Sequence, residues 1–179
     1  MSDRAEILGK LPDATPAPFE SFPADFAGFE SSVEPAIMWS MFAVQLEALG
    51  GRVIEDVEGK DWLSKRRWCD PILGLENTAD SIWTAEVGFS AAVAAIAKSG
   101  TLIVEAGPEV ERRSSLIPPV NVVLVPRTAI VPTLNEALAA LSDRTAVFIT
   151  GPSRTADIEG VMVRGVHGPG QLLVWVKDQ

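Results

Sequence analysis

The stretch of sequence that decides the fold is residues 147–159, VFITGPSRTADIE, which is followed closely by residues 165–169, GVHGP. It begins as a short apolar run, and such a run bounded by turn residues predicts a buried strand. The run ends at residues 150–152, Thr-Gly-Pro, because glycine and proline side by side mark a turn. We therefore expect a strand that stops abruptly and hands the chain to a loop.

A short helix is predicted directly after this turn. Ser153 and Thr155 are residue types that cap helix N-termini, and Asp157 would lie near the positive end of the helix dipole. Arg154 adds a planar guanidinium that binds carboxylates and phosphates. Ligands of open α/β sheets bind at the carboxyl ends of strands, and helix N-termini favour anions. The pattern predicts a ligand-binding loop formed by Gly151, Ser153, Arg154 and Thr155. It also fits a capped corner without a ligand.

The rest of the chain predicts strands that alternate with helices. Strands are expected at residues 52–54, 101–105, 120–125, 145–150 and 172–176, with 81–84 as a further candidate, and helices at 35–49, 61–68, 109–117 and 132–141. The β-branched run at 120–125 is typical of a strand buried on both faces. Residues 91–97 fit a helix by composition and equally fit a hairpin that leads into the strand at 101–105. The alternation predicts an α/β fold with a mostly parallel sheet.

The first 29 residues differ in composition from the rest. We expect a short helix at residues 3–10, followed by a proline-rich arm at residues 12–23, and phenylalanines stand at positions 19, 22, 26 and 29. A disordered tail rarely carries so many aromatic residues, so we expect the arm to pack along the body or along a partner subunit. Residues 30–179 are long enough for a single domain with a sizeable core.

Composition and charge exclude several classes of function. The 179-residue chain has 47% hydrophobic residues, which is ample for a core, and a net charge of −9. A surface this acidic argues against binding to nucleic acid or to an anionic membrane. No apolar run is long enough for a membrane span, and the charged N-terminus lacks a signal-peptide core, so we expect a cytoplasmic protein. Cys69 and His167 are the only residues of their types. We therefore expect neither a metal site nor an iron–sulfur cluster in this chain.

Two further residues are candidates for catalysis. His167 lies between glycines in residues 165–169, where the backbone can approach a ligand closely, and its usual pKa suits proton transfer. The alternative is a histidine that only fixes its own loop. Glu105 ends the strand at 101–105 and is a weaker candidate. Walker, dinucleotide-binding and nucleophile-elbow motifs are all absent. The sequence contains no complete catalytic set, so whether the chain is an enzyme stays open.

Several ordered segments resemble those of one known family. Residues 151–159 with 165–169 resemble the C-terminal signature of the LUD-domain proteins, the LutC/YkgG lactate-utilisation family. Residues 95–102 resemble that family's AIAxTGTL segment, with Ser99 where threonine is usual. Residues 116–126 and 130–132 resemble its LLPPxHIxLVP and IVP segments, with Asn121 where histidine is common. Several motifs in the right order are far more specific than one short pattern.

The resemblance implies both a fold and a role. The implied fold is the NagB/RpiA/CoA-transferase-like three-layer sandwich. The implied role is that of a subunit or accessory protein in a system that oxidises lactate to pyruvate, with iron–sulfur clusters on partner subunits. The loop at residues 151–155 would bind a small anionic ligand or a partner protein.

Two other functions stay open. One is a free-standing enzyme acting on a sugar phosphate or CoA ester, with Arg154 holding the anion and Asp157, His167 or Glu105 reacting. The other is a non-catalytic interaction protein. A homo-oligomer is compatible with each of these functions.

Overall fold

The computed structural model describes residues 34–54, 66–69, 79–106, 112–142, 144–156 and 160–177. The chain divides into two units, Met1–Glu30 and Ser31–Gln179, and all described residues belong to the second. The proline-rich arm and most of the helix expected at residues 61–68 therefore lie outside the described residues.

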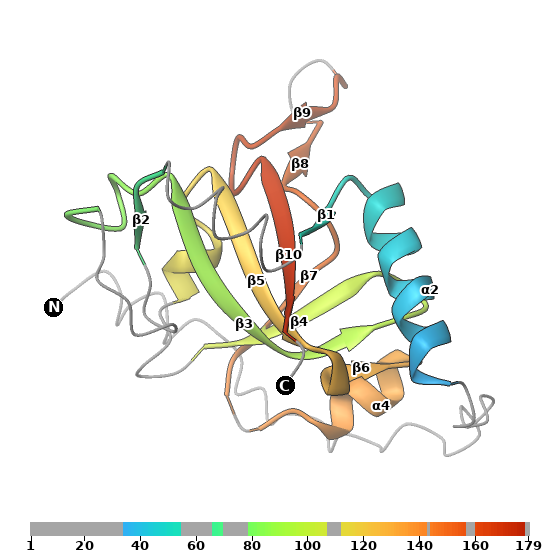
Figure 1. Cartoon of the computed structure of the whole chain (residues 1–179). Helices are drawn as coiled ribbons and strands as arrows, with labels where there is room; N and C mark the ends of the chain where they lie inside the picture. Colours follow the sequence, from blue (N-terminus) through green and yellow to red (C-terminus); the bar gives the residue numbers. More distant parts are fainter. Residues whose placement is uncertain are drawn as a thin grey trace, which may run out of the picture. The chain divides into compact units, whose positions relative to one another are not determined.

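The described residues form one large sheet and a small ribbon beside it (Figure 1). The strand order of the large sheet is β1-β10-β5-β3-β4-β7, and β2 and β6 also pair with β3. Its strands are β1 Arg52–Ile54, β2 Trp68–Cys69, β3 Val87–Ile96, β4 Thr101–Glu105, β5 Val120–Pro126, β6 Ile130–Val131, β7 Ala146–Ile149 and β10 Gln171–Lys177. The ribbon consists of β8 Arg154–Thr155 and β9 Val163–Arg164. The helical elements are α2 Pro35–Ala48, η2 Arg112–Ser115, η3 Arg127–Ala129 and α4 Leu134–Ala139.

Most strand pairs of the large sheet are parallel. Strands β1, β10, β5 and β3 run side by side in the same direction, and β2 and β6 are parallel to β3. Only the β3–β4 and β4–β7 pairs of this sheet are antiparallel in the part of the chain that the structure describes. Six of the seven residues of β5 are buried, as expected for a strand covered on both faces. The predicted α/β fold with a mostly parallel sheet is confirmed.

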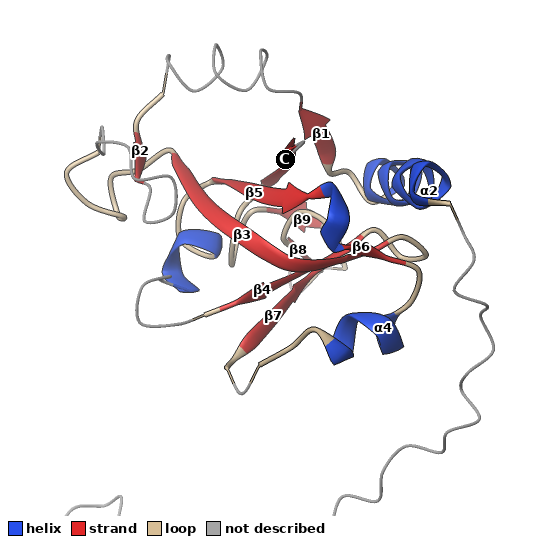
Figure 2. Ribbon diagram, turned by 60° about the horizontal axis from the view of Figure 1, so that its bottom comes forward, coloured by secondary structure: helices blue, strands red, loops and turns tan. Residues whose placement is uncertain are grey.

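Strand β3 connects the two parts of the sheet. Its first half pairs with β5, its second half pairs with β4, and the register shifts between Ala92 and Ala94. Figure 2 shows this strand curving across the molecule. The turn that follows contains Gly100 at φ +64°, where a Cβ atom would lie 2.6 Å from the Leu46 backbone nitrogen. The segment at 91–97 is therefore a hairpin strand and not a helix. Its alanines fit because both faces are closely covered.

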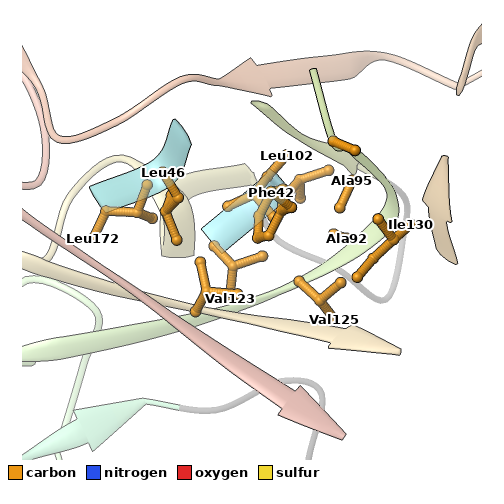
Figure 3. Close-up of a cluster of buried hydrophobic side chains, with 12 residues drawn as sticks. Phe42, Leu46, Ala92, Ala95, Leu102, Val123, Val125, Ile130 and Leu172 are labelled. Carbon is orange, nitrogen blue, oxygen red and sulfur yellow. The ribbon is translucent and has the colours of Figure 1, made fainter. Parts of the chain in front are cut away.

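The core lies on both faces of the parallel strands. On one face, Phe42 and Leu46 of α2 pack with Val123, Val125 and other buried side chains (Figure 3). On the other face, a second cluster gathers around Phe89, Val122, Leu173 and Trp175. Strand residues alternate between the two faces, so β5 and β10 each contribute to both clusters. Each fully buried large apolar side chain contributes about 1.5–3 kcal/mol to the free energy of unfolding.

Several predicted elements differ from the structure. Residues 81–84 form a turn and not a strand, and Trp68 belongs to β2, where it pairs with Val87. The described part of the helix expected at 109–117 is only the short turn η2. The helix expected at 132–141 is shorter, since α4 spans Leu134–Ala139. These are short segments in which pairing and packing outweigh local propensity.

Candidate functional site

The two glycine-containing segments near the C-terminus lie against each other. We call residues 151–156 the signature loop and residues 165–170 the glycine loop. The Ser153 backbone N–H donates to the Pro169 carbonyl at 2.8 Å, and the Gly165 N–H donates to the Ser153 carbonyl at 3.0 Å. A Cβ atom on Gly168 would lie 3.3 Å from the Ser153 Cβ. The structure therefore joins these loops into one unit, although eight residues separate them in sequence.

A helix that begins at Ser153 is wrong, whereas a helix capped by Thr155 would depend on residues 157–159, which lie outside the described residues. Arg154 and Thr155 form β8, which pairs antiparallel with Arg164 and Val163 of β9. The Ser153 N–H, expected at a helix start, is bonded instead to Pro169. The backbone here makes cross-strand hydrogen bonds, so no helix N-terminus is present at residues 153–155. An anion site built on a helix dipole is therefore not available at these residues.

The position of the loop also differs from the expectation. The loop does leave the carboxyl end of β7, but the glycine loop that it contacts leads into the amino end of β10. The Gln171 N–H at this end donates to the Pro119 carbonyl, just before β5, at 3.3 Å. The signature loop thus lies at the amino edge of the parallel strands, whereas ligands of open α/β sheets usually bind at the carboxyl edge.

Arg154 is committed to the end of a helix. Its guanidinium donates a hydrogen bond to the Leu49 carbonyl, directly after α2. A Cβ atom on Gly50 would lie 2.7 Å from the Arg154 Nη2 and 3.3 Å from the Arg164 Nη2, so both guanidinium groups stand over this helix end. Positive charge is favourable at a helix C-terminus. Arg154 therefore stabilises α2, a role that the sequence did not indicate.

The other residues predicted for this site have different environments. Gly151 has φ +117°, and a Cβ atom there would lie 3.1 Å from the Leu49 carbonyl oxygen, so the tight turn requires glycine. Thr155 is half-buried in β8, and His167 is exposed in the glycine loop. Asp157 lies outside the described residues. The structure therefore brings together Gly151, Ser153, Arg154 and the loop that contains His167.

Glu105 is not part of this unit. Its carboxylate accepts hydrogen bonds from the Ser142 backbone N–H at 2.6 Å and from the Ser142 hydroxyl at 2.7 Å. The backbone bond from Ser142, aided by the hydroxyl, lowers the pKa of Glu105 below its ordinary value of 4.5. In the antiparallel β4–β7 pair, Glu105 stands beside the first residue of β7, whereas the signature loop follows the last one. Glu105 is thus separated from the candidate site by the length of that pair.

Three hydroxyl groups connect the start of β4 to the beginning of the signature loop. The Thr101 Oγ1 lies 2.8 Å from the Ser99 Oγ and 3.0 Å from the Thr150 Oγ1. Thr101 is buried, and Thr150 directly precedes Gly151. This chain of hydrogen bonds fixes the point at which the loop leaves the sheet.

Sequence reasoning missed one buried polar pair near the same edge. The Ser90 hydroxyl of β3 donates to the Asn121 Oδ1 of β5 at 2.7 Å, and both residues are buried. The signal was present as a single polar residue inside the apolar run at 120–125. It was read only as a departure from the family pattern, because periodicity does not indicate which buried position has a polar neighbour across the sheet.

Comparison with known proteins identifies the class. The family model of the LUD domain matches residues 43–176, so the chain belongs to the LUD-domain family. A crystal structure of a DUF162-family protein from Deinococcus radiodurans has the same fold, with a TM-score of 0.60 and 19% identity. That match covers 80% of this chain and 98% of the other.

Among individual relatives, the chain is similar to proteins named lactate utilization protein C. It is 34% identical over 123 residues to the one from Bacillus subtilis (strain 168), which covers 62% of this chain and 50% of that protein. It is also 34% identical over 109 residues to the one from Geobacillus kaustophilus (strain HTA426), covering 56% and 45%. The chain spans about half the length of the curated relatives it matches.

No described helix is long and apolar enough to cross a membrane. Within the described residues, no group of three or more histidine, cysteine, aspartate or glutamate side chains is arranged to hold a metal ion.

Proposed function

We propose that this chain is a LutC-like component of a lactate-utilisation system, in which it acts beside iron–sulfur subunits that oxidise lactate to pyruvate. The joined signature and glycine loops are the part that contacts a small organic acid or a partner subunit. The similarity to proteins named lactate utilization protein C supports the role. The location rests on a single observation, the pair of backbone hydrogen bonds that links Ser153 to Pro169 and to Gly165.

The division of labour follows from the residues that the chain contains. Iron–sulfur clusters need several cysteine thiolates, and the sequence has one cysteine and one histidine. Electron transfer is therefore assigned to the partner subunits. This chain contributes a surface and a loop unit that is fixed to α2 through Arg154.

Exposed apolar side chains favour contact with a partner protein at the same unit. Val161 and Met162 precede β9 and are 61% and 63% exposed, and Val166 of the glycine loop is 46% exposed. The β8–β9 ribbon projects beyond the large sheet (Figure 1). Apolar side chains gathered on a projecting element are typical of a protein-binding surface.

Reconstitution tests this proposal. The purified chain is expected to reduce no dye with lactate by itself, and to raise lactate-dependent dye reduction when it is added to the iron–sulfur subunits of a lactate-utilisation system. Gly168→Ala places a methyl group against Ser153 and should lower that stimulation. Robust turnover by the isolated chain, or no effect on the partner subunits, would contradict the proposal.

A matched variant makes the location specific. A Cβ atom on Gly170 meets its nearest neighbour at 3.5 Å, an ordinary contact. Gly170→Ala should therefore keep the stimulation that Gly168→Ala loses. Equal loss in both variants would mean that the loops respond to any added side chain and that the contact between them has no special role.

A further inference from the structure

A buried hydrogen bond on the α2 side of the sheet leaves one amide group unpaired. The Ser90 hydroxyl donates to the Asn121 Oδ1 at 2.7 Å, and both residues are 1% exposed. The Asn121 Nδ2 is enclosed and has no hydrogen-bond partner. The Ser90 hydroxyl bonds only to the oxygen end of the amide, so the N–H donors at the other end stay unsatisfied. A buried donor without an acceptor is destabilising and uncommon, so the Asn121 Nδ2 is a candidate for contact with a ligand.

Asn121 stands where the apolar core gives way to the loops. Alternate residues of a strand share a face, so Asn121 lies on the same face as Val123 and Val125. Those two valines pack with Phe42 and Leu46 of α2. Asn121 is the second residue of β5, at the amino end of that face. The unpaired amide is therefore at the edge at which the signature and glycine loops lie.

Three segments meet above this edge. Gly88 pairs in register with Asn121, and a Cβ atom on Gly88 would clash with the Ser114 carbonyl oxygen and lie 2.8 Å from the Pro118 Cγ. The segment at 114–118 thus lies directly on the sheet, one strand away from Asn121. A Cβ atom on Gly168 would be 3.9 Å from the Leu116 carbonyl oxygen and 3.3 Å from the Ser153 Cβ. The glycine loop therefore bridges this segment and the signature loop.

We infer that the Asn121 Nδ2 is the buried donor of a ligand site beneath these three segments, and that the ligand is a small organic acid whose carbonyl or carboxylate oxygen accepts the bond. An amide N–H selects an oxygen acceptor and offers nothing to a cation. Arg112 and Arg113 begin η2, so positive charge stands at the outer end of the segment that covers Gly88. This inference rests on the proposed function, because the signature loop forms part of the cover.

The ligand enters when the cover opens. Asn121 and Ser90 are enclosed, so an acceptor reaches Nδ2 only after the overlying segments move. In the described residues, the signature and glycine loops are joined to each other by the bonds of Ser153 with Pro169 and of Gly165 with Ser153. Loop segments of this kind open locally at much lower cost than the core strands.

Nuclear magnetic resonance of the full-length chain tests the contact directly. The chain has three asparagines and three glutamines, so the side-chain NH₂ signals of Asn121 can be assigned by their loss in Asn121→Leu. Titration with sodium pyruvate or sodium L-lactate should shift these signals saturably. The signals of Asn135 on α4 should stay in place, and sodium chloride at equal ionic strength serves as the blank. Asn121 signals that do not respond to either acid overturn the inference.

A variant measurement keeps the test independent of assignment. Ser90→Ala with Asn121→Leu removes both members of the pair and should keep the melting temperature of the free protein, while the rise caused by pyruvate or lactate is lost. Survival of that rise in the double variant contradicts the inference. If neither acid acts on the wild type but reconstituted lactate oxidation still depends on the chain, the ligand site is wrong and the proposed function stands. If pyruvate or lactate binds but the chain has no effect on reconstituted lactate oxidation, the ligand site stands and the proposed function is wrong.

Discussion

Two polar pairs of the protein differ in how completely they are hydrogen-bonded: Glu105 with Ser142, and Asn121 with Ser90. At the end of β4, the Glu105 carboxylate takes two hydrogen bonds from Ser142 near the surface. At the start of β5, Asn121 has one bond from Ser90 inside the protein and an unpaired Nδ2. The sequence makes Glu105 a candidate for catalysis because it is a charged residue at the end of an apolar strand. The Glu105 carboxylate uses its acceptors to hold the chain after α4 through Ser142. The Asn121 Nδ2, by contrast, still has N–H groups that can donate to a ligand.

The difference shows how burial and pairing together separate a structural residue from a candidate binding residue. When a surface carboxylate loses one of its hydrogen-bond partners, the cost in free energy is small, because water can replace that partner. A buried amide has no such replacement.

The largest effect is expected where the cover meets the sheet. Gly88→Ala adds a methyl group that clashes with the Ser114 carbonyl, so the segment at 114–118 must move. Overpacking against backbone should lower the free energy of unfolding by about 1–3 kcal/mol, toward the upper end. Urea denaturation measures this change. Gly170→Ala, with only ordinary contacts, should stay within about 0.5 kcal/mol of the wild type and serves as the control. Equal stability of Gly88→Ala and the wild type would mean that the segment does not rest on β3.

The buried pair itself should show strong coupling. Ser90→Ala removes the one bond to Asn121 and leaves the whole amide unsatisfied, which should cost about 1–2 kcal/mol. The double change Ser90→Ala with Asn121→Leu should recover most of that loss, since neither polar group remains. A double-mutant cycle by urea denaturation gives the coupling. Simple additivity of the two changes would show that the side chains do not interact.

A smaller effect on stability is expected from a change at Arg154 in the signature loop. Arg154→Ala removes an exposed guanidinium from the Leu49 carbonyl at the end of α2, and should lower the free energy of unfolding by about 0.3–1 kcal/mol at low salt. High salt should shrink the difference. Arg164→Ala, whose guanidinium lies farther from Gly50, should cost less. A loss that is independent of salt would argue against a helix-end role.

The smallest effect concerns how steeply the melting temperature falls at acidic pH. The pKa of Glu105 is lowered in the folded protein, so its contribution is present above the ordinary pKa of 4.5 and is lost as the pH falls through the lowered value. Glu105→Gln should therefore make melting temperature fall less steeply in acid. The Thr133 hydroxyl bond similarly lowers the pKa of Glu136, which keeps some pH dependence. A steeper fall at acidic pH in Glu105→Gln would contradict the assignment.

Sequence reasoning predicted the large elements well and the site only in part. The apolar runs that became β4, β5 and β10 are buried, as their composition predicts. The prediction of a buried strand at β7 is wrong, since its residues are at most half-buried and Phe148 is 46% exposed. A helix that begins at Ser153 is wrong because Arg154 and Thr155 pair instead with β9, which lies several residues further along the chain. The role of Arg154 was not accessible, since Leu49 is 105 residues away in sequence.

Asn121 also shows that the sequence alone does not indicate which residues meet in the folded protein. A polar residue in an apolar strand is visible in the sequence, but its meaning depends on Ser90, 31 positions earlier, and on the loops above it. Strand order and register bring these residues together, and neither follows from periodicity. The parallel β3–β5 pairing had to be known before the unpaired amide could be recognised.

The most direct measurement compares the two polar pairs in one experiment. Melting temperatures of the wild type, of Glu105→Gln, and of Ser90→Ala with Asn121→Leu are measured with and without sodium pyruvate. The account predicts that pyruvate raises the melting temperature of the wild type and of Glu105→Gln to the same extent, and leaves the double variant unchanged. A rise that disappears in Glu105→Gln and persists in the double variant would contradict it.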